Sequence, residues 1–361
     1  MTAVVDAGPT NGLATPHRRR GAVLLVALLV LLLLGIVVSA TIGQLPVSRS
    51  EVVGSLLRHI GISTGWAPAE GSLVDRTLDH IRYPRVVMSV AIGAALAISG
   101  AVMQAIFGNP LAEPGVVGVS AGAALGASIA IALGLAVAGS WSVAALAFAG
   151  AFLATMLVYV TARSGGRTEV VTLLLTGIAV NAIAGAGLAL VMFVGDTAAR
   201  EQIVFWQLGS LNGSLWSEVV IVIAVGVPAA LVAIALAHRY DLLALGERTA
   251  GHLGVRVEAL RLVSIVLVTL LAAVAVAFAG IISFVGLVVP HLVRILVGPS
   301  HRLLLVASAL GGAVLLVWAD LLARTVVVGA DLPIGLLTAL VGGPFFFWLI
   351  RRARQRSGGW A

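Results

Sequence analysis

Few side chains in this sequence are of the types that carry out covalent chemistry. All 22 residues in the lysine-plus-arginine count are arginine, and cysteine is absent. Without lysine the chain has no G-x-x-x-x-G-K-[ST] phosphate-binding loop, and without cysteine it has no thiolate nucleophile, disulfide or thiolate metal site. The seven histidines show no H-x-x-x-H or H-E-x-x-H spacing, and no Ser/His/Asp grouping emerges. The sequence therefore argues against an enzyme, and we expect no metal or cofactor bound by this chain.

The polar residues that remain gather in short clusters, the first of which covers Asn109–Gly115 with the sequence Asn-Pro-Leu-Ala-Glu-Pro-Gly. Two prolines and a glycine predict an ordered, non-helical elbow between apolar segments. A generic turn would explain the prolines alone. It would not explain why so short a connection carries both an amide and a carboxylate.

A second polar cluster covers Leu243–Gly254. Gly246, Gly251 and Gly254 divide it into what we predict to be one or two short helices. Its mixture of charged and apolar residues suits a contact with another protein. A purely solvated loop is the alternative interpretation.

A third group consists of arginines. Arg82 and Arg85 flank a Tyr-Pro pair, and Arg324 follows Asp320 at the i,i+4 spacing that permits a helical ion pair. The planar guanidinium fork pairs bidentately with carboxylates, which suits docking of an acidic partner. The alternative is that these arginines snorkel or anchor lipid headgroups.

These clusters must be positioned by helices that span a membrane. Hydrophobic residues make up 60% of the chain, charged residues 10%, and the mean hydropathy is +1.12, which excludes a soluble globule. Ten segments are apolar over roughly the 20 residues that a spanning helix needs. They are Gly21–Gly43, Val86–Phe107, Val117–Val137, Val143–Thr161, Val170–Val194, Val219–Ala237, Leu260–Ala279, Ile282–Val297, Leu303–Leu322 and Ile334–Ile350.

The arginines also predict the orientation of these spans. With the N-terminus inside and the spans alternating, 15 of the 22 arginines lie on the inner side, as the positive-inside rule requires. We therefore predict an all-α polytopic membrane protein of about ten transmembrane helices with both termini cytoplasmic. Its parts are a tail at 1–20, a transmembrane domain at 21–350 with a cytoplasmic loop at 238–258, and a tail at 351–361.

Local patterns add three expectations. The outer connection Gln44–Arg85 is long enough for a surface helix around Arg49–His59. Glycines at 118, 122 and 126 form a small-residue strip that lets another helix approach closely. The eighth and tenth spans are short and interrupted, at Phe284-Val285-Gly286 and Gly342-Gly343-Pro344. Broken helices are tolerated at membrane depth only where protein or a water-filled cavity covers the backbone.

Taken together, these blocks resemble the permease family of ATP-binding-cassette importers for iron–siderophores, haem and cobalamin, the FecCD/BtuC-type or type II importers. The resemblance covers about Arg82 to Arg352, and more weakly the first span. The motifs that carry it are Arg82-Tyr83-Pro84-Arg85, Gly93–Gln104, Asn109–Gly115, Gly118–Ala123, Leu245–Gly254, Gly286–His291, Asp331–Gly335 and Thr338–Phe346.

The resemblance implies a homodimer with the path on its two-fold axis, two cytoplasmic ATPase subunits that hold ATP and magnesium, and an extracytoplasmic substrate-binding protein. It places the chain in the plasma membrane of a bacterium, in contact with lipid and without nucleic acid. It assigns Asn109 and Leu111 to a cytoplasmic gate and Arg82, Arg85 and Arg324 to binding-protein docking. The coupling residues that it implies are Leu243, Leu245, Gly246, Glu247, Ala250, His252, Leu253 and Gly254.

Two matters stay open at this point. The small polar pair that the family often carries as a second gate, between spans four and five, has no clear counterpart in Gly165-Gly166-Arg167-Thr168-Glu169. Possible path linings from spans five and eight are Asn181, Met192, Phe193 and Phe284. For the substrate we favour haem, because Glu113-Pro114-Gly115 and Leu332–Gly335 resemble haem and cobalamin members, followed by a ferric siderophore and cobalamin. The alternative class is an ion-driven secondary transporter, which would need ionisable residues deep in the spans.

Overall fold

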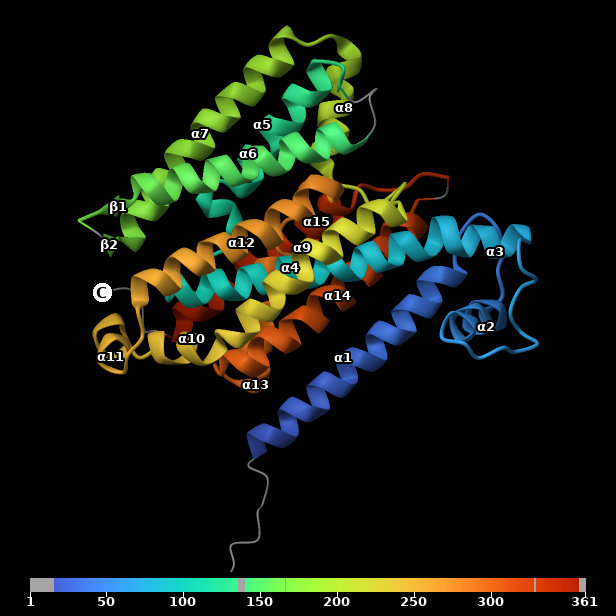
Figure 1. Ribbon diagram of the computed structural model, residues 1–361, viewed down its shortest axis with the longest axis horizontal. Coiled ribbons are helices and arrows are strands. Elements are labelled where there is room, and N and C mark those ends of the chain that lie inside the picture. The colour runs from blue at the N-terminus through green and yellow to red at the C-terminus, as the bar shows by residue number, and fades with distance from the viewer. Residues whose placement is uncertain (1–15, 136–139, 166, 328, 357–361) are drawn as a thin grey trace, which may run out of the picture.

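The computed structural model describes residues 16–356 apart from 136–139, 166 and 328. It confirms an all-α polytopic architecture, in which each predicted span corresponds to one helix (Figure 1). Within these described residues, seven helices are long and apolar enough to cross a membrane, and three apolar helices are shorter. These ten are α1 (Pro16–Thr41), α4 (Tyr83–Phe107), α5 (Val119–Ala132), α6 (Ser140–Thr161), α7 (Val170–Val194), α9 (Trp216–Ala235), α12 (Val257–Ala279), α13 (Val285–Val297), α14 (His301–Thr325) and α15 (Ile334–Arg356).

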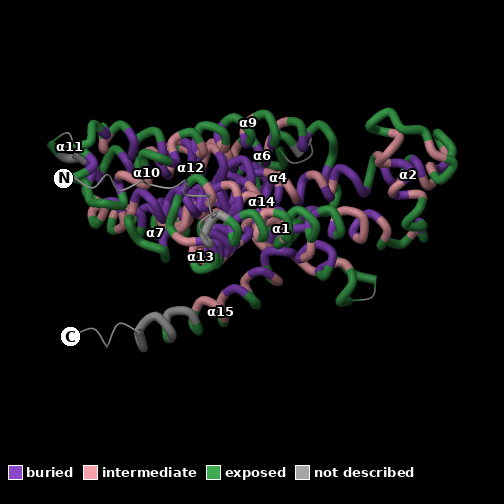
Figure 2. Tube along the Cα trace, turned by 90° about the horizontal axis from the view of Figure 1, so that it is seen from below, coloured by how far each residue is buried: buried purple, intermediate pink, exposed green. Residues whose placement is uncertain are grey.

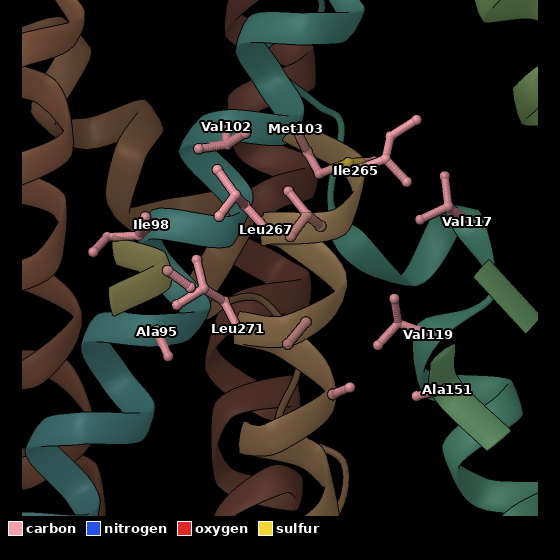
Figure 3. Close-up of a cluster of buried hydrophobic side chains, with 14 of the residues drawn as sticks. Ala95, Ile98, Val102, Met103, Val117, Val119, Ala151, Ile265, Leu267 and Leu271 are labelled. Carbon is pink, nitrogen blue, oxygen red and sulfur yellow. The ribbon is translucent and has the colours of Figure 1, made fainter. Parts of the chain in front are cut away.

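Helix α4 lies at the centre of the bundle and packs against α9, α12, α13 and α14. It is buried over most of its length, as its apolar residues on all sides require. Figure 3 shows side chains of α4, such as Met103, beside Ile265 and Leu271 of α12. Glycines bring the backbones close: a Cβ built on Gly100 would lie 1.8 Å from the carbonyl oxygen of Gly286 in α13.

The predicted glycine strip is confirmed at two of its three positions. A Cβ on Gly122 would lie 2.3 Å from the carbonyl oxygen of Gly150, and one on Gly126 would lie 2.0 Å from that of Leu146, so both glycines admit α6. Gly118 has a different structural role. It sits one residue before α5 with φ +91°, a left-handed conformation that ends the preceding 3-10 helix Pro114–Val117.

Helix α5 is shorter than the predicted Val117–Val137, of which residues 136 and 137 lie outside the described residues. Its 14 residues extend about 21 Å at ~1.5 Å per residue, against a hydrocarbon core of about 30 Å. The segment before it packs into the bundle, where the 3-10 helix Pro114–Val117 contacts α7. The side-chain amide of Asn181, eleven residues into α7, donates to the carbonyl oxygen of Gly115 at 3.2 Å. The end of the predicted elbow is therefore held against α7, and its last two residues, Pro114 and Gly115, are helical, in contrast to the predicted non-helical conformation.

The outer segment contains the predicted surface helix, α2 (Arg49–His59). Beyond it, α3 (Leu73–Thr77) and a π-helical turn (Leu78–Arg82) run directly into α4, so this helix begins at Leu73 and not at the predicted Val86. Apolar counting missed the extension because its outer turns carry Asp75, Arg76 and Asp79. It also missed α8 (Thr197–Leu208), an amphipathic helix capped by Asp196.

At the inner end, the second polar cluster, Leu243–Gly254, contains one short helix, α11 (Glu247–His252), and is preceded by α10 (Ala237–Leu243), which ends at the first residue of the cluster. Two-residue strands β1 (Arg163–Ser164) and β2 (Arg167–Thr168) pair between α6 and α7. Figure 1 shows β1, β2, α10 and α11 at the same end of the molecule. The inner loop between α9 and α12 and the connection between α6 and α7 are therefore neighbours.

Three helices leave long apolar faces uncovered. Helices α1 and α7 run along opposite sides of the bundle in Figure 1, and in both only a small part of the apolar window is buried. Helix α15 extends away from the body in Figure 2. Such faces fit a lipid-exposed surface or an interface with a second copy.

Candidate functional site

The predicted coupling residues fall into two groups around α11. Leu245, His252 and Leu253 are exposed, whereas Leu243 and Ala250 are buried and hold α10 and α11 onto the bundle. Gly246 has φ +100° and Gly254 has φ +85°, so glycines in left-handed conformations bound the helix on both sides. The segment is thus a six-residue helix at the inner end of the molecule, flanked by the exposed apolar side chains of Leu245 and Leu253.

A cluster of polar side chains joins α11 to the bundle and was not identified from the sequence. Arg261 of α12 pairs through Nη2 with the carboxylate of Glu247, and its Nη1 donates to the carbonyl oxygen of Thr168 at 2.9 Å. Glu258, three residues earlier on α12, accepts the backbone N–H of Thr168 at 3.1 Å and also its hydroxyl hydrogen. Tyr159 of α6 donates to the same carboxylate at 3.5 Å.

The other inner helix of the loop, α10, is anchored separately. Asp241 accepts the backbone N–H of His301 at 2.8 Å and contacts the imidazole Nδ1 at 2.7 Å, so it caps the first turn of α14. Tyr240 is fully buried and bonds to the hydroxyl of Ser264 at 2.9 Å. Burial raises the pKa of Tyr240 to about 12, although the bond to Ser264 acts in the opposite direction.

The two predicted gate residues lie together at the inner end of α4. Gly108 ends the helix with φ 58°, and the Oδ1 atom of Asn109 accepts the backbone N–H of Leu111 at 2.9 Å. This bond is an Asx-turn, which holds the chain in a defined conformation after the helix. Asn109 and Leu111 are both exposed, so their side chains are available at the surface of this chain.

The three outer arginines all have partners within the chain. Arg82 is buried, and its guanidinium donates to the carbonyl oxygens of Ala40, Thr41 and Leu45 at the end of α1. Its predicted docking role conflicts with this position, because a buried side chain that caps α1 is not presented to a partner. A cation satisfies the free carbonyls at a helix C-terminus, which is the reason for its burial.

Arg85 and Arg324 converge on the buried carboxylate of Asp320. Arg85 approaches it at 2.9–3.2 Å from α4, and the Nε atom of Arg324 lies 3.2 Å from it, which confirms the predicted i,i+4 pair. Arg85 also pairs with Asp331 at 2.8 Å, and Arg324 donates to the backbone and hydroxyl of Ser39. These two arginines thus tie α4, α14 and α1 together at the outer end.

The four predicted lining residues are not equivalent. Phe193 is 80% exposed at the outer end of α7, whereas Met192 packs partly into the core and Asn181 is turned inward toward Gly115. Phe284, which precedes α13, has φ 67°, the only positive value at a non-glycine residue in the described part of the chain. It lines a cavity of 40 Å³ together with Glu113, and its ring lies 6.3 Å from that of Phe346. The structure thus leaves Phe193 open and places Phe284 at a strained break between helices.

Comparison with known proteins identifies the family. The FecCD transport family matches residues 31–352. The chain is 39% identical over 352 residues to the hemin transport system permease HmuU of Yersinia pestis, covering 96% of this chain and all of the relative. It is also 39% identical to the cobalamin import system permease BtuC of Halobacterium salinarum, covering 91% of this chain and 95% of the relative. A solved inward-facing metal-chelate type ABC transporter has a TM-score of 0.80 at 31% identity over 92% of this chain and 99% of its own. The chain belongs to the FecCD transport family.

Proposed function

We propose that this chain is the translocation subunit of an ATP-driven haem importer. Its family membership makes it a multi-pass inner-membrane permease of an ABC importer. The observation that supports an ATP-driven role is α11, a short helix that is flanked by the exposed Leu245 and Leu253 and whose Glu247 is tied to the bundle core. A chain without a phosphate-binding loop needs such a surface to receive an ATPase.

The assembly we propose has two copies of this chain, two ATPase subunits below and a binding protein above. ATP and magnesium are held by the ATPases, and α11 with its flanking residues from Leu243 to Gly254 enters a cleft on each of them. ATP-driven closure of the ATPases shifts α11, and the path then switches between outward- and inward-facing states. Asn109 and Leu111 form the cytoplasmic gate of that path.

On the outer face, we propose that Arg85 and Arg324 receive the binding protein. Asp331 is partly exposed beside Arg85, so a carboxylate on the partner is able to take its place on the guanidinium. Phe193 and Phe284 are proposed to line the path. A wide apolar path fits a large chelate better than a hydrated ion.

Haem is favoured as substrate because the hemin permease matches this chain from end to end. Cobalamin is the second candidate, since the archaeal cobalamin permease is equally identical over nearly the same length. The test is to purify the cognate binding protein and titrate it with haem, a ferric siderophore and cobalamin. We expect tight binding of haem, and a protein that bound only siderophores would contradict the choice.

The importer role itself is tested in proteoliposomes. Uptake should require the ATPase, the binding protein and ATP together, so uptake by this chain alone without ATP would overturn the proposal. Gly246→Ala should weaken retention of the ATPase on an affinity column, because alanine strains a backbone at φ +100°. Gly71→Ala is the matched control: it also has a positive φ and open space around it, but lies on the outer face. It should retain the ATPase fully.

A further inference from the structure

We propose that Arg261 is the positioning residue through which α11 moves the β1–β2 hairpin and, with it, the start of α7. This inference rests on the proposed function, since it names the internal route by which an ATPase bound at α11 would act. The observation behind it is a juxtaposition of three segments. The buried side chain of one arginine on α12 joins the loop before α12 to the connection between α6 and α7.

The two ends of the arginine differ in exposure. The side chain of Arg261 is 7% exposed, whereas that of its partner Glu247 is 58% exposed. Glu247 is the first residue of α11, directly after Gly246. A partner that docks on α11 therefore acts on a carboxylate at the surface, and this carboxylate is bonded to a guanidinium inside.

On the buried side of Arg261, every polar group of Thr168 is hydrogen-bonded to a side chain of α12. The carbonyl oxygen of Thr168 accepts from Arg261, while its N–H and hydroxyl both donate to Glu258. All three polar groups of one residue are thus bonded to α12 within a single turn. Helix α7 begins two residues later, at Val170, so a displacement of Thr168 also displaces the first turn of α7.

Because Arg261 is buried, a movement of α11 is coupled to a movement of the hairpin. A buried guanidinium that loses its carboxylate is strongly destabilised, because a charge without a partner is left in a medium of low dielectric. When α11 shifts, Arg261 therefore follows Glu247 or draws on its other partner, Thr168. In either case the hairpin responds. Arginine suits the task because its planar fork bonds two partners in fixed directions, which a lysine ammonium does not.

The test compares wild type with Arg261→Gln and Arg261→Lys in nanodiscs with the ATPase, in nucleotide-free and ATP–vanadate states. Amide hydrogen exchange is measured for α11 and for the peptide containing β1 and β2. In wild type we expect both segments to change on nucleotide trapping. In the two variants we expect α11 to change while the hairpin does not. In proteoliposomes with the ATPase and the binding protein, we expect the uptake per ATP hydrolysed to fall about tenfold, within the usual range of coupling between sites.

Arg302→Gln is the matched control, because Arg302 is exposed at the inner end of α14 and lies outside the cluster. It should behave like wild type. Thr168→Val serves if the arginine variants fail to fold, since it removes only the hydroxyl bond to Glu258, and it should weaken the hairpin response. A hairpin that responds normally in Arg261→Lys while α11 responds would overturn the inference alone. If hydrogen exchange in α11 of the wild type did not change on nucleotide trapping, the proposed function, on which this inference rests, would be overturned.

Discussion

Asp320 is the residue on which the outer end of the bundle depends. Its carboxylate is 2% exposed and neutralises both Arg85 and Arg324, which come from different helices. Asp320→Asn should lower the free energy of unfolding by about 3 kcal/mol or more, because it leaves the poorly solvated guanidinium of Arg324 without an anion and Arg85 with Asp331 alone. Thermal unfolding in detergent, followed by tryptophan fluorescence, measures the loss.

Asp331→Asn is the control for that experiment. Asp331 also pairs with Arg85, but its side chain is 38% exposed, so solvent screens the pair and the expected cost is about 1 kcal/mol or less. Equal losses in the two variants would contradict a special role for Asp320. The same comparison bears on docking, since only Asp331 can be displaced from Arg85 without exposing a buried charge.

Glu51 gives the outer helix α2 a dependence on pH. The backbone N–H of Ser48 donates to this carboxylate at 2.8 Å and lowers its pKa below 4.5, and the Ser48 hydroxyl adds to the effect. Because the folded pKa is lower than the unfolded one, the stabilisation is full above about pH 4.5 and is lost as the pH falls through the folded value. Hydrogen exchange in α2, corrected for intrinsic rates, should therefore accelerate below pH 4.5.

The matched variant for α2 is Glu51→Gln. Glutamine keeps an acceptor for the N–H of Ser48 but carries no charge to titrate, so the acceleration in acid should disappear while α2 persists at neutral pH. Acceleration of the same size in this variant would show that another group is responsible. Ser48→Ala removes the other half of the capping box and should cost about 1 kcal/mol at neutral pH.

At this scale, sequence reasoning identified residue types better than their partners. The i,i+4 pair of Asp320 and Arg324 followed from spacing and is confirmed. The partners of Arg82 were not predicted, because nothing in the sequence shows that the end of α1, more than 35 residues earlier, packs against it. The Arg261 cluster was missed for the same reason: its members lie on four segments, and each is an ordinary polar residue in isolation.

Among the elements, the bundle relies on glycines where helices cross. Gly100→Ala should be strongly destabilising, because its methyl group would lie 1.8 Å from the backbone oxygen of Gly286, and a backbone cannot yield as a flexible side chain does. We expect a loss of at least about 3 kcal/mol, at the level of severe overpacking. Detergent thermal unfolding and the yield of monodisperse protein are suitable measurements.

Gly185→Ala in α7 is the matched control. A Cβ at this position meets no atom within 4 Å, so the change should be neutral or stabilise the helix by up to about 1 kcal/mol. Similar behaviour of the two variants would mean that the α4–α13 contact is looser than the structure shows. Comparing the two variants separates the effect of a close backbone contact from that of helix propensity, since both glycines lie inside long helices.

Hydropathy predicted the number and order of the ten apolar helices, since an apolar run of spanning length has few alternatives. The ends of the helices were not. Polar outer turns hid the start of the α3–α4 helix at Leu73, and the amphipathic α8 gave no apolar run to count. The packing of the Asn109–Gly115 elbow against α7 was not predicted either, because it depends on a contact with Asn181 far along the chain.

At the scale of the whole molecule, the question is which of α1 and α7 lies at the interface of a homodimer. Both expose apolar side chains, and they lie on opposite sides of the bundle, so a homodimer with one interface can cover only one of them (Figure 1). The proposed path, lined by Phe193 and Phe284, places α7 toward the two-fold axis. Helix α1 should then face lipid, consistent with its leucine- and valine-rich surface.

Because the chain contains no cysteine, a single introduced cysteine labels each copy once. Spin labels at Ile183→Cys on α7 and Val30→Cys on α1, both exposed, should give different distances between the two copies of a dimer. We expect the shorter distance for α7, since an isologous interface brings the same element of both copies to the axis. A shorter distance for α1 would place the axis on the opposite side of the bundle. That result would also place Phe193 outside the path. The two label distances therefore decide which face of the molecule lines the path of the substrate.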